Sequence, residues 1–142
     1  MKIYKLLTVT DQVLDAFKRL IPQLAPDCAL PTKKDLEAIV NSGTTLLFMA
    51  EENNEILGTL TLVFTKIPTG DKLWIEDVVV DHSARGKGVG VKLMEFSIAY
   101  AKSKNMKTIN LTSSPDRIAA NTLYQKLGFI QRETNVYRLT IA

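Results

Sequence analysis

The stretch that decides the fold is Val78-Val79-Val80-Asp81-His82-Ser83-Ala84-Arg85-Gly86-Lys87-Gly88-Val89-Gly90. Three valines end a β-rich run, a short polar turn follows, and three alternating glycines precede a helix-like segment. Glycine permits backbone conformations that turn successive N–H groups toward one point, and such a nest at a helix N-terminus binds anions. Because a helix dipole alone contributes only ~0.3–1 kcal/mol, the stretch predicts an anion site that combines several N–H groups with Arg85 and Lys87.

Two common phosphate-binding motifs do not fit this turn. A P-loop requires lysine and then serine or threonine after its last glycine, whereas Gly88 is followed by Val89 and Gly90. The dinucleotide-binding fingerprint would need a further glycine where Val91 or Leu93 stands. A nucleotide-binding protein of either kind is therefore not favoured by the sequence.

The segments on either side of the turn predict a mixed α/β sheet with helices packed against it. Apolar residues at helical spacing predict helices from Asp11 until Pro22 ends the first, from a cap at Thr32 to residues 41–43, from Gly90 to about Lys102, and from a cap at Ser114 to Gly128. The β-rich runs are 2–7, 45–50, 56–64, 73–80, 108–112 and 136–141, with room for a short strand at 129–131. Residues 51–55 join two of them as a predicted hairpin.

The fourth predicted helix contains Ala119-Ala120-Asn121-Thr122-Leu123-Tyr124-Gln125-Lys126-Leu127-Gly128-Phe129. At about 100° per residue, Ala119, Leu123 and Leu127 form one apolar stripe, which we expect to pack on the sheet. Asn121 and Tyr124 lie about 60° apart on one flank and are expected to face a common space. Gly128 is the predicted left-handed cap of this helix, and Phe129 is expected to return the chain to the core.

These two segments together resemble the GNAT acetyltransferases. The pattern R-x-x-G-x-G at Arg85, Gly88 and Gly90 resembles the pyrophosphate loop of that family, although His82 stands where the family often has proline. The pattern A-x-x-x-Y-x-x-x-G-F, from Ala120 to Phe129, resembles its second motif. The resemblance implies a GNAT acyltransferase fold: a mixed, mostly antiparallel sheet of about six to seven strands with about four helices, in a single N-acetyltransferase domain of residues 1–142.

The resemblance also implies a cosubstrate, acetyl-coenzyme A, and a role for each matching residue. The backbone of one strand would bind the pantetheine arm and polarise the thioester carbonyl. The glycine-rich loop would grip the pyrophosphate. Asn121 would contact the pantetheine or line the route of the amine, and Tyr124 would protonate the leaving sulfur. The strand residues are Val78, Val79 and Val80, and the loop residues are Arg85, Gly86, Lys87, Gly88, Val89 and Gly90.

Acetyl transfer to an amine also needs a base, because an alkylamine with a pKa of ~10.4 is mostly protonated at neutral pH. Glu76 is the candidate. In a regular strand it alternates with Val78 and Val80 and shares their face, and Asp77 points the other way. A β-bulge would exchange the two. The alternatives left open are that Glu76 only satisfies backbone or arginine partners, and that water acts as the base.

Composition limits the remaining possibilities. The chain has 142 residues and a formal charge of +3, with no Lys/Arg run longer than two, so the sequence predicts no nucleic-acid partner. No apolar segment approaches the ~20 residues of a membrane span, and the first residues lack a signal-peptide core. With the single Cys28, this predicts a cytoplasmic protein without disulfides. No Cys/His cluster accompanies His82, so no metal site is expected.

The functional prediction is therefore an acyltransferase. It transfers an acetyl group from acetyl-CoA to a primary amine by direct attack in a ternary complex. The acceptor, a small molecule or a peptide, is left open among protein N-termini, lysines, polyamines, amino acids and amino sugars. The alternative is a non-catalytic acyl-CoA-binding sensor or scaffold. A homodimer is a further expectation from the resemblance.

Overall fold

The computed structural model describes residues 1–142. The chain divides into two compact units, Met1–Thr112 and Ser113–Ala142, and each is described by itself.

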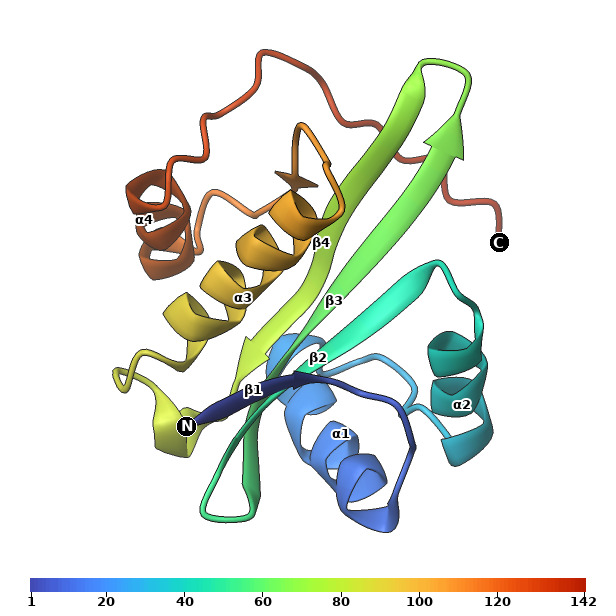
Figure 1. Cartoon of the computed structure of the whole chain (residues 1–142), viewed down its shortest axis with the longest axis vertical. Helices are drawn as coiled ribbons and strands as arrows, with labels where there is room; N and C mark the ends of the chain where they lie inside the picture. Colours follow the sequence, from blue (N-terminus) through green and yellow to red (C-terminus); the bar gives the residue numbers. More distant parts are fainter. The chain divides into compact units, whose positions relative to one another are not determined.

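The first unit is a mixed five-stranded sheet in the order β1-β2-β3-β4-β5 (Figure 1). The first three neighbouring pairs are antiparallel, and β4 and β5 are parallel. Three α-helices belong to this unit and a fourth, α4, to the second unit. The elements are β1 (Lys2–Lys5), α1 (Asp11–Leu24), α2 (Lys33–Asn41), β2 (Thr45–Glu52), β3 (Glu55–Ile67), β4 (Gly70–Val80), the 3₁₀ turn η1 (His82–Ala84), α3 (Val89–Ser103), β5 (Asn110–Leu111) and α4 (Ile118–Lys126). The predicted mixed sheet with four helices is confirmed, with five strands in place of six to seven.

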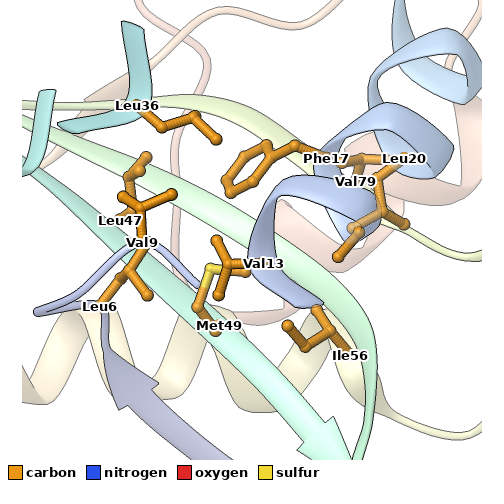
Figure 2. Packing of buried hydrophobic residues seen from close by; sticks show 11 residues of the cluster. Leu6, Val9, Val13, Phe17, Leu20, Leu36, Leu47, Met49, Ile56 and Val79 are labelled. Atoms are coloured by element: carbon orange, nitrogen blue, oxygen red, sulfur yellow. The ribbon is translucent and has the colours of Figure 1, made fainter. Parts of the chain in front are cut away.

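Helices α1 and α2 cover one face of the sheet. Val13, Phe17 and Leu20 of α1 recur at helical spacing and are buried. They pack in one apolar cluster with Leu36 of α2 and with sheet residues that include Met49 (Figure 2). Fully burying a side chain of this size contributes about 1.5–3 kcal/mol. The amphipathic pattern of the sequence thus determines which side of each helix faces the sheet.

The beginnings of these helices and the first hairpin follow the predictions. The side chain of Thr32 accepts a hydrogen bond from the Asp35 N–H (3.1 Å), and the Asp35 carboxylate accepts one from the Thr32 N–H (2.9 Å), which makes a capping box. Strands β2 and β3 are joined through Asn53 and Asn54, both at positive φ, a conformation that asparagine tolerates.

The end of α1 differs from its prediction. Pro22 was expected to end the helix, but α1 continues to Leu24. A proline removes one hydrogen bond within a helix. Here it lies in the last turn, where the Ala25 N–H still donates to the Ile21 carbonyl (2.8 Å). Because Ile21 and Leu24 pack against the core cluster, the helix extends past the proline.

Helix α3 covers the other face of the sheet. Phe48 of β2 packs edge-on against Phe96 and Tyr100 of α3, with ring centroids 4.9 and 5.4 Å apart. Leu93 and Met94 are completely buried on the same helix. The sheet therefore has an α1/α2 face and an α3 face. Each side chain near the end of β4 points toward one of these two faces.

In the second unit, α4 begins later than predicted. Ser114 and Pro115 do not start the helix, which begins at Ile118. The Arg117 N–H donates to the Ser114 carbonyl (3.1 Å), and this closes a turn ahead of the helix. The exposed fractions also differ from the expected stripe. Tyr124 is the buried residue of α4, whereas Ala119 is exposed.

The end of α4 is as predicted. Gly128 has φ 99°, and its N–H donates to the Gln125 carbonyl (3.1 Å). The Phe129 N–H donates to the Tyr124 carbonyl (3.0 Å), and the two rings lie 6.1 Å apart. This is a Schellman motif with its usual hydrophobic contact, and it requires glycine at position 128.

The predicted last strands are absent. Residues 129–131 and 136–141 have no strand structure, and Val136, Tyr137, Leu139 and Ile141 are exposed. Alternating apolar residues describe a segment that is able to pair, but a strand forms only where a neighbour supplies the hydrogen bonds. The difference in strand number comes from these two segments.

Candidate active site

Strand β4 contains a β-bulge beside the candidate base. Thr61 of β3 pairs with Glu76, whereas Thr59 pairs with Val79, so β4 carries one extra residue between these pairs. Directly opposed residues share a face of the sheet. Thr59 and Thr61 are two residues apart and share a face, and Glu76 therefore lies on the same face as Val79.

The bulge corrects the expected face of Glu76. Thr59 and Thr61 pair with Met49 and Leu47, both of which belong to the cluster under α1 and α2. Val80 instead pairs with Gly58, which faces α3. The regular-strand prediction that Glu76 shares a face with Val80 is thus wrong, because the extra residue reverses the alternation. Glu76 points to the α1/α2 side and is exposed.

Asp77 lies within the bulge and has a strained backbone conformation. Its φ is 47°, a left-handed conformation that costs a non-glycine residue about 1–3 kcal/mol. Like Glu76, it is exposed. Two carboxylates are thus presented to solvent at the same irregularity of the sheet.

The bulged end of β4 also has an open edge. Strand β5 pairs with β4 only at Trp74 and Ile75. Beyond Ile75, Val79 and Val80 pair with β3 on one side, and no strand pairs with Val78, Val79 or Val80 on the other. Backbone groups along such an edge are able to bond an extended ligand in the manner of an added strand.

The glycine-rich loop follows directly. Gly86 and Gly88 have φ of 81° and 78°, so both adopt the left-handed conformation for which glycine is suited. Gly88 is the N-cap of α3, which begins at Val89, one residue earlier than predicted, and no side chain caps it. The first N–H groups of a helix lack partners within the helix. With Arg85 and Lys87 exposed beside them, the loop has the donors and the charge of an anion site.

The packing of Gly58 sets the position of this helix end. A Cβ on Gly58 would lie 3.0 Å from the Val79 carbonyl oxygen, 3.1 Å from Val89 Cγ1 and 3.3 Å from Leu93 Cδ1. Val89 begins α3, Leu93 lies one turn further along it, and both are fully buried. The absence of a side chain at position 58 therefore allows the N-terminus of α3 to approach the sheet closely.

A substitution at Gly58 tests this close approach. We expect Gly58→Ala to destabilise the protein by about 1–3 kcal/mol, because the new methyl group has no space beside Val89 and Leu93. Chemical denaturation measures the change. Without a steric conflict, alanine in a strand would be more stable than glycine, so an unchanged or raised unfolding free energy would contradict the packing described.

Sequence reasoning missed two residues of α1 that hold the turn before the loop. Arg19 Nε donates to Asp81 Oδ2 (2.7 Å), and a second guanidinium nitrogen donates to the Ile56 carbonyl. Gln23 Oε1 accepts from the His82 N–H (2.9 Å). The two side chains lie one helical turn apart, but their partners are 37 to 62 positions away in the chain. No local pattern in the sequence indicates such contacts.

Asp81 itself links β4 to the turn η1. Its side chain is 9% exposed and also accepts from the Ser83 N–H (3.2 Å). Burial raises the pKa of this carboxyl. The bonds from Arg19 and Ser83, together with the charge of Arg19, outweigh that effect and hold the pKa below its ordinary value. The carboxylate is therefore ionised at neutral pH.

The second unit carries the two remaining predicted residues. Tyr124 is 6% exposed, and burial raises the pKa of its phenol, an effect that the charge of Arg117 partly opposes. Its proton is therefore retained at neutral pH. Asn121 donates through Nδ2 to the Ser114 carbonyl (3.0 Å) and so supports the turn ahead of α4.

The remaining features of the surface do not involve the predicted site residues. A shallow depression of about 410 Å³ is lined mainly by α1 and the β2–β3 turn, including Gln12, Arg19 and Asn54, and by none of the predicted site residues. Nowhere does the structure gather three His, Cys, Asp or Glu side chains that could hold a metal ion. None of its helices has the length and apolar character needed to cross a bilayer.

Comparison with known proteins identifies the family. The sequence profile described as the acetyltransferase (GNAT) family matches residues 10–129. The uncharacterized N-acetyltransferase YhdJ of Bacillus subtilis is 34% identical over 98 residues, which cover 66% of this chain and 68% of that protein. Streptothricin acetyltransferase of Escherichia coli is 36% identical over 77 residues, which cover 54% of this chain and 42% of that protein. This chain thus spans less than half of the length of that second relative.

Two solved structures show the same fold. The aminoglycoside acetyltransferase meta-AAC0020 from an uncultured soil metagenomic sample, in complex with sisomicin, superposes with a TM-score of 0.85 at 19% identity, over 99% of this chain and 96% of that one. AAC(6')-Iy, in complex with the bisubstrate analog CoA-S-monomethyl-acetylneamine, superposes with a TM-score of 0.79 at 19% identity, over 99% of this chain and 98% of that one. The chain belongs to the GNAT acetyltransferase family, which is a family of acyltransferase enzymes. The resemblance found in the sequence is thereby confirmed.

Proposed function

We propose that residues 1–142 act as a single N-acetyltransferase domain, which transfers an acetyl group from acetyl-CoA to a primary amine by direct attack in a ternary complex. The observation that carries the proposal is the loop from Arg85 to Gly90. Its glycines at positive φ precede an uncapped helix N-terminus, with two exposed cations beside it. Such a loop suits the diphosphate of coenzyme A, which carries negative charge and accepts several hydrogen bonds.

The cosubstrate would lie along β4. The loop residues Arg85, Gly86, Lys87, Gly88, Val89 and Gly90 would hold the diphosphate. The open edge of Val78, Val79 and Val80 would bond the pantetheine arm, and one N–H of that edge would donate to the thioester oxygen as negative charge develops. Asn121 would contact the pantetheine or the route of the amine. When bound, acetyl-CoA supplies the thioester that is cleaved.

An ammonium group must lose two protons to become an amide nitrogen. We propose that Glu76 accepts the first, directly or through a water molecule. The neutral amine nitrogen then forms a bond to the carbonyl carbon, and the carbon–sulfur bond breaks. We propose that Tyr124 gives its proton to the departing thiolate, and that the second proton of the nitrogen restores the phenol, directly or through water. The buried phenol of Tyr124 is protonated at neutral pH, as an acid must be.

The proposed acceptor is a small molecule with a cationic amine. Glu76 and Asp77 are exposed together at the bulge and would attract such a group. The names of the similar proteins, a streptothricin acetyltransferase and an aminoglycoside acetyltransferase, support the same class. We also propose a cytoplasmic site of action, since Cys28 is the single cysteine of the chain. Assembly as a homodimer remains a proposal from the family resemblance.

Release of free thiol from acetyl-CoA tests the proposed reaction. We expect release to require an added amine, with polyamines, amino sugars and amino acids compared at equal concentration and a peptide amine as a further acceptor. Mass spectrometry of the acceptor should show one added acetyl group. If the protein bound acetyl-CoA yet released no thiol with any amine, the result would favour the alternative, a non-catalytic acyl-CoA sensor.

A further inference from the structure

We propose that Arg19 and Gln23 of α1 are positioning residues for the cofactor loop, and that they hold the turn from which the loop emerges. This inference rests on the proposed use of residues 85–90 to bind coenzyme A. It adds to that proposal a part of the protein that lies outside both sequence motifs. Helix α1 would determine how well the diphosphate is held without touching it.

The contacts form one connected arrangement. Arg19 joins two strand ends, since its guanidinium donates both to Asp81 at the end of β4 and to the Ile56 carbonyl in β3. The Asp81 N–H donates to the Leu57 carbonyl (2.8 Å), so Asp81 is held through its backbone as well as its side chain. Asp81 therefore has a fixed position at the point where the sheet ends.

From Asp81 the arrangement extends into the turn. The Asp81 carboxylate caps η1 through the Ser83 N–H, and the Asp81 carbonyl accepts from the Ala84 N–H (2.9 Å). Gln23 fixes the intervening residue by accepting from the His82 N–H. Each backbone N–H from His82 to Ala84 is thereby satisfied, and the chain enters Arg85 in one direction.

The contacts of Asp81 are strong enough to affect the order of the loop. Asp81 is nearly buried and ionised, so loss of its Arg19 partner leaves a carboxylate with reduced compensation, and a hydrogen bond to a charged group contributes more than one between neutral groups. Arg19 is 41% exposed, which reduces its own contribution. From Arg85 onward the backbone hydrogen bonds of the loop are long, 3.5 Å from the Arg85 N–H to the His82 carbonyl and 3.4 Å from the Lys87 N–H to the Ala84 carbonyl. The order of the loop therefore depends on how firmly its entrance is held.

The inference predicts a loss that is confined to the diphosphate end of the ligand. Coenzyme A and pantetheine both carry the thiol arm, but only coenzyme A carries the diphosphate. We expect Arg19→Gln to weaken coenzyme A binding about tenfold and to leave the dissociation constant of pantetheine unchanged. Gln23→Met, which keeps the side-chain length and removes the acceptor for His82, should produce a smaller loss of the same selective kind.

Lys18→Gln is the matched control. Lys18 is an exposed neighbour on the same helix, and its substitution removes the same charge without removing any of these bonds. We expect coenzyme A binding by this variant to stay within about twofold of the unmodified protein, because exposed charges are screened by salt. NMR titration measures both ligands, including weak binding of pantetheine, and thermal unfolding shows whether each variant is folded.

The measured affinities either support the positioning role of Arg19 and Gln23 or contradict it. A selective loss of coenzyme A affinity in Arg19→Gln and Gln23→Met supports the inference. Equal losses for both ligands, no loss, or a loss as large in Lys18→Gln would overturn it while leaving the proposed function in place. Failure of the unmodified protein to bind either ligand would overturn the proposed function and this inference with it.

Discussion

Gly88→Glu is expected to abolish binding of coenzyme A. Gly88 has φ 78° and is the N-cap of α3, so a side chain there is strained and stands at the mouth of the proposed nest. A carboxylate about 4 Å from a phosphate is repelled by about 4 kcal/mol near a protein surface, which corresponds to a roughly thousandfold loss of affinity. Calorimetric titration with coenzyme A measures the effect.

Gly43→Glu provides the matched control for that result. Gly43 has φ 74° and, like Gly88, open space around it, but it lies in the turn between α2 and β2. The two variants therefore share the backbone strain and the added charge and differ only in position. Wild-type affinity in Gly88→Glu, or an equal loss in Gly43→Glu, would refute the loop as the diphosphate site.

Tyr124→Phe is expected to lower turnover by at least about tenfold, and the affinity for acetyl-CoA should change little. A positioned acid typically contributes ~10²–10⁴ in rate, and phenylalanine retains the ring while removing the proton donor. The ring contact with Phe129 is kept, so the end of α4 should stay intact. Steady-state kinetics at saturating acetyl-CoA give the turnover, and titration gives the affinity.

The control for the phenol is Tyr100→Phe. Tyr100 lies in α3, where its ring packs against Phe48 and Phe64, and it has no proposed role in the reaction. This variant should retain the turnover of the unmodified protein. An undiminished rate in Tyr124→Phe would remove Tyr124 from the acid role and would point to water or another group as the proton donor.

The parts of the fold that the sequence predicted well are those with local physical causes. The capping box at Thr32 needs only residues 32–35, and the cap at Gly128 needs only the helix that it ends. The glycine-rich loop was located for the same reason, since its conformation depends on its own glycines. In each case the interacting groups lie within a few residues of one another.

Apart from the late start of α4, which has a local cause, the main errors occur where a partner distant in the chain decides the structure. A bulge is a relation between two strands, so the sequence around Glu76 could indicate it only as an alternative. The salt bridge between Arg19 and Asp81 joins residues 62 positions apart. The expected strand at 136–141 had the right alternation, but pairing depends on a neighbour that the segment itself does not specify.

Titration of the unmodified protein with coenzyme A tests the central claim most directly, which is that the bulged strand β4 and the loop after it form a site for that molecule. The account predicts saturable binding of one coenzyme A per chain, weakened by added salt because the loop holds its diphosphate through charge and N–H groups. Absence of any saturable binding at millimolar coenzyme A, by a protein shown to be folded, would contradict it.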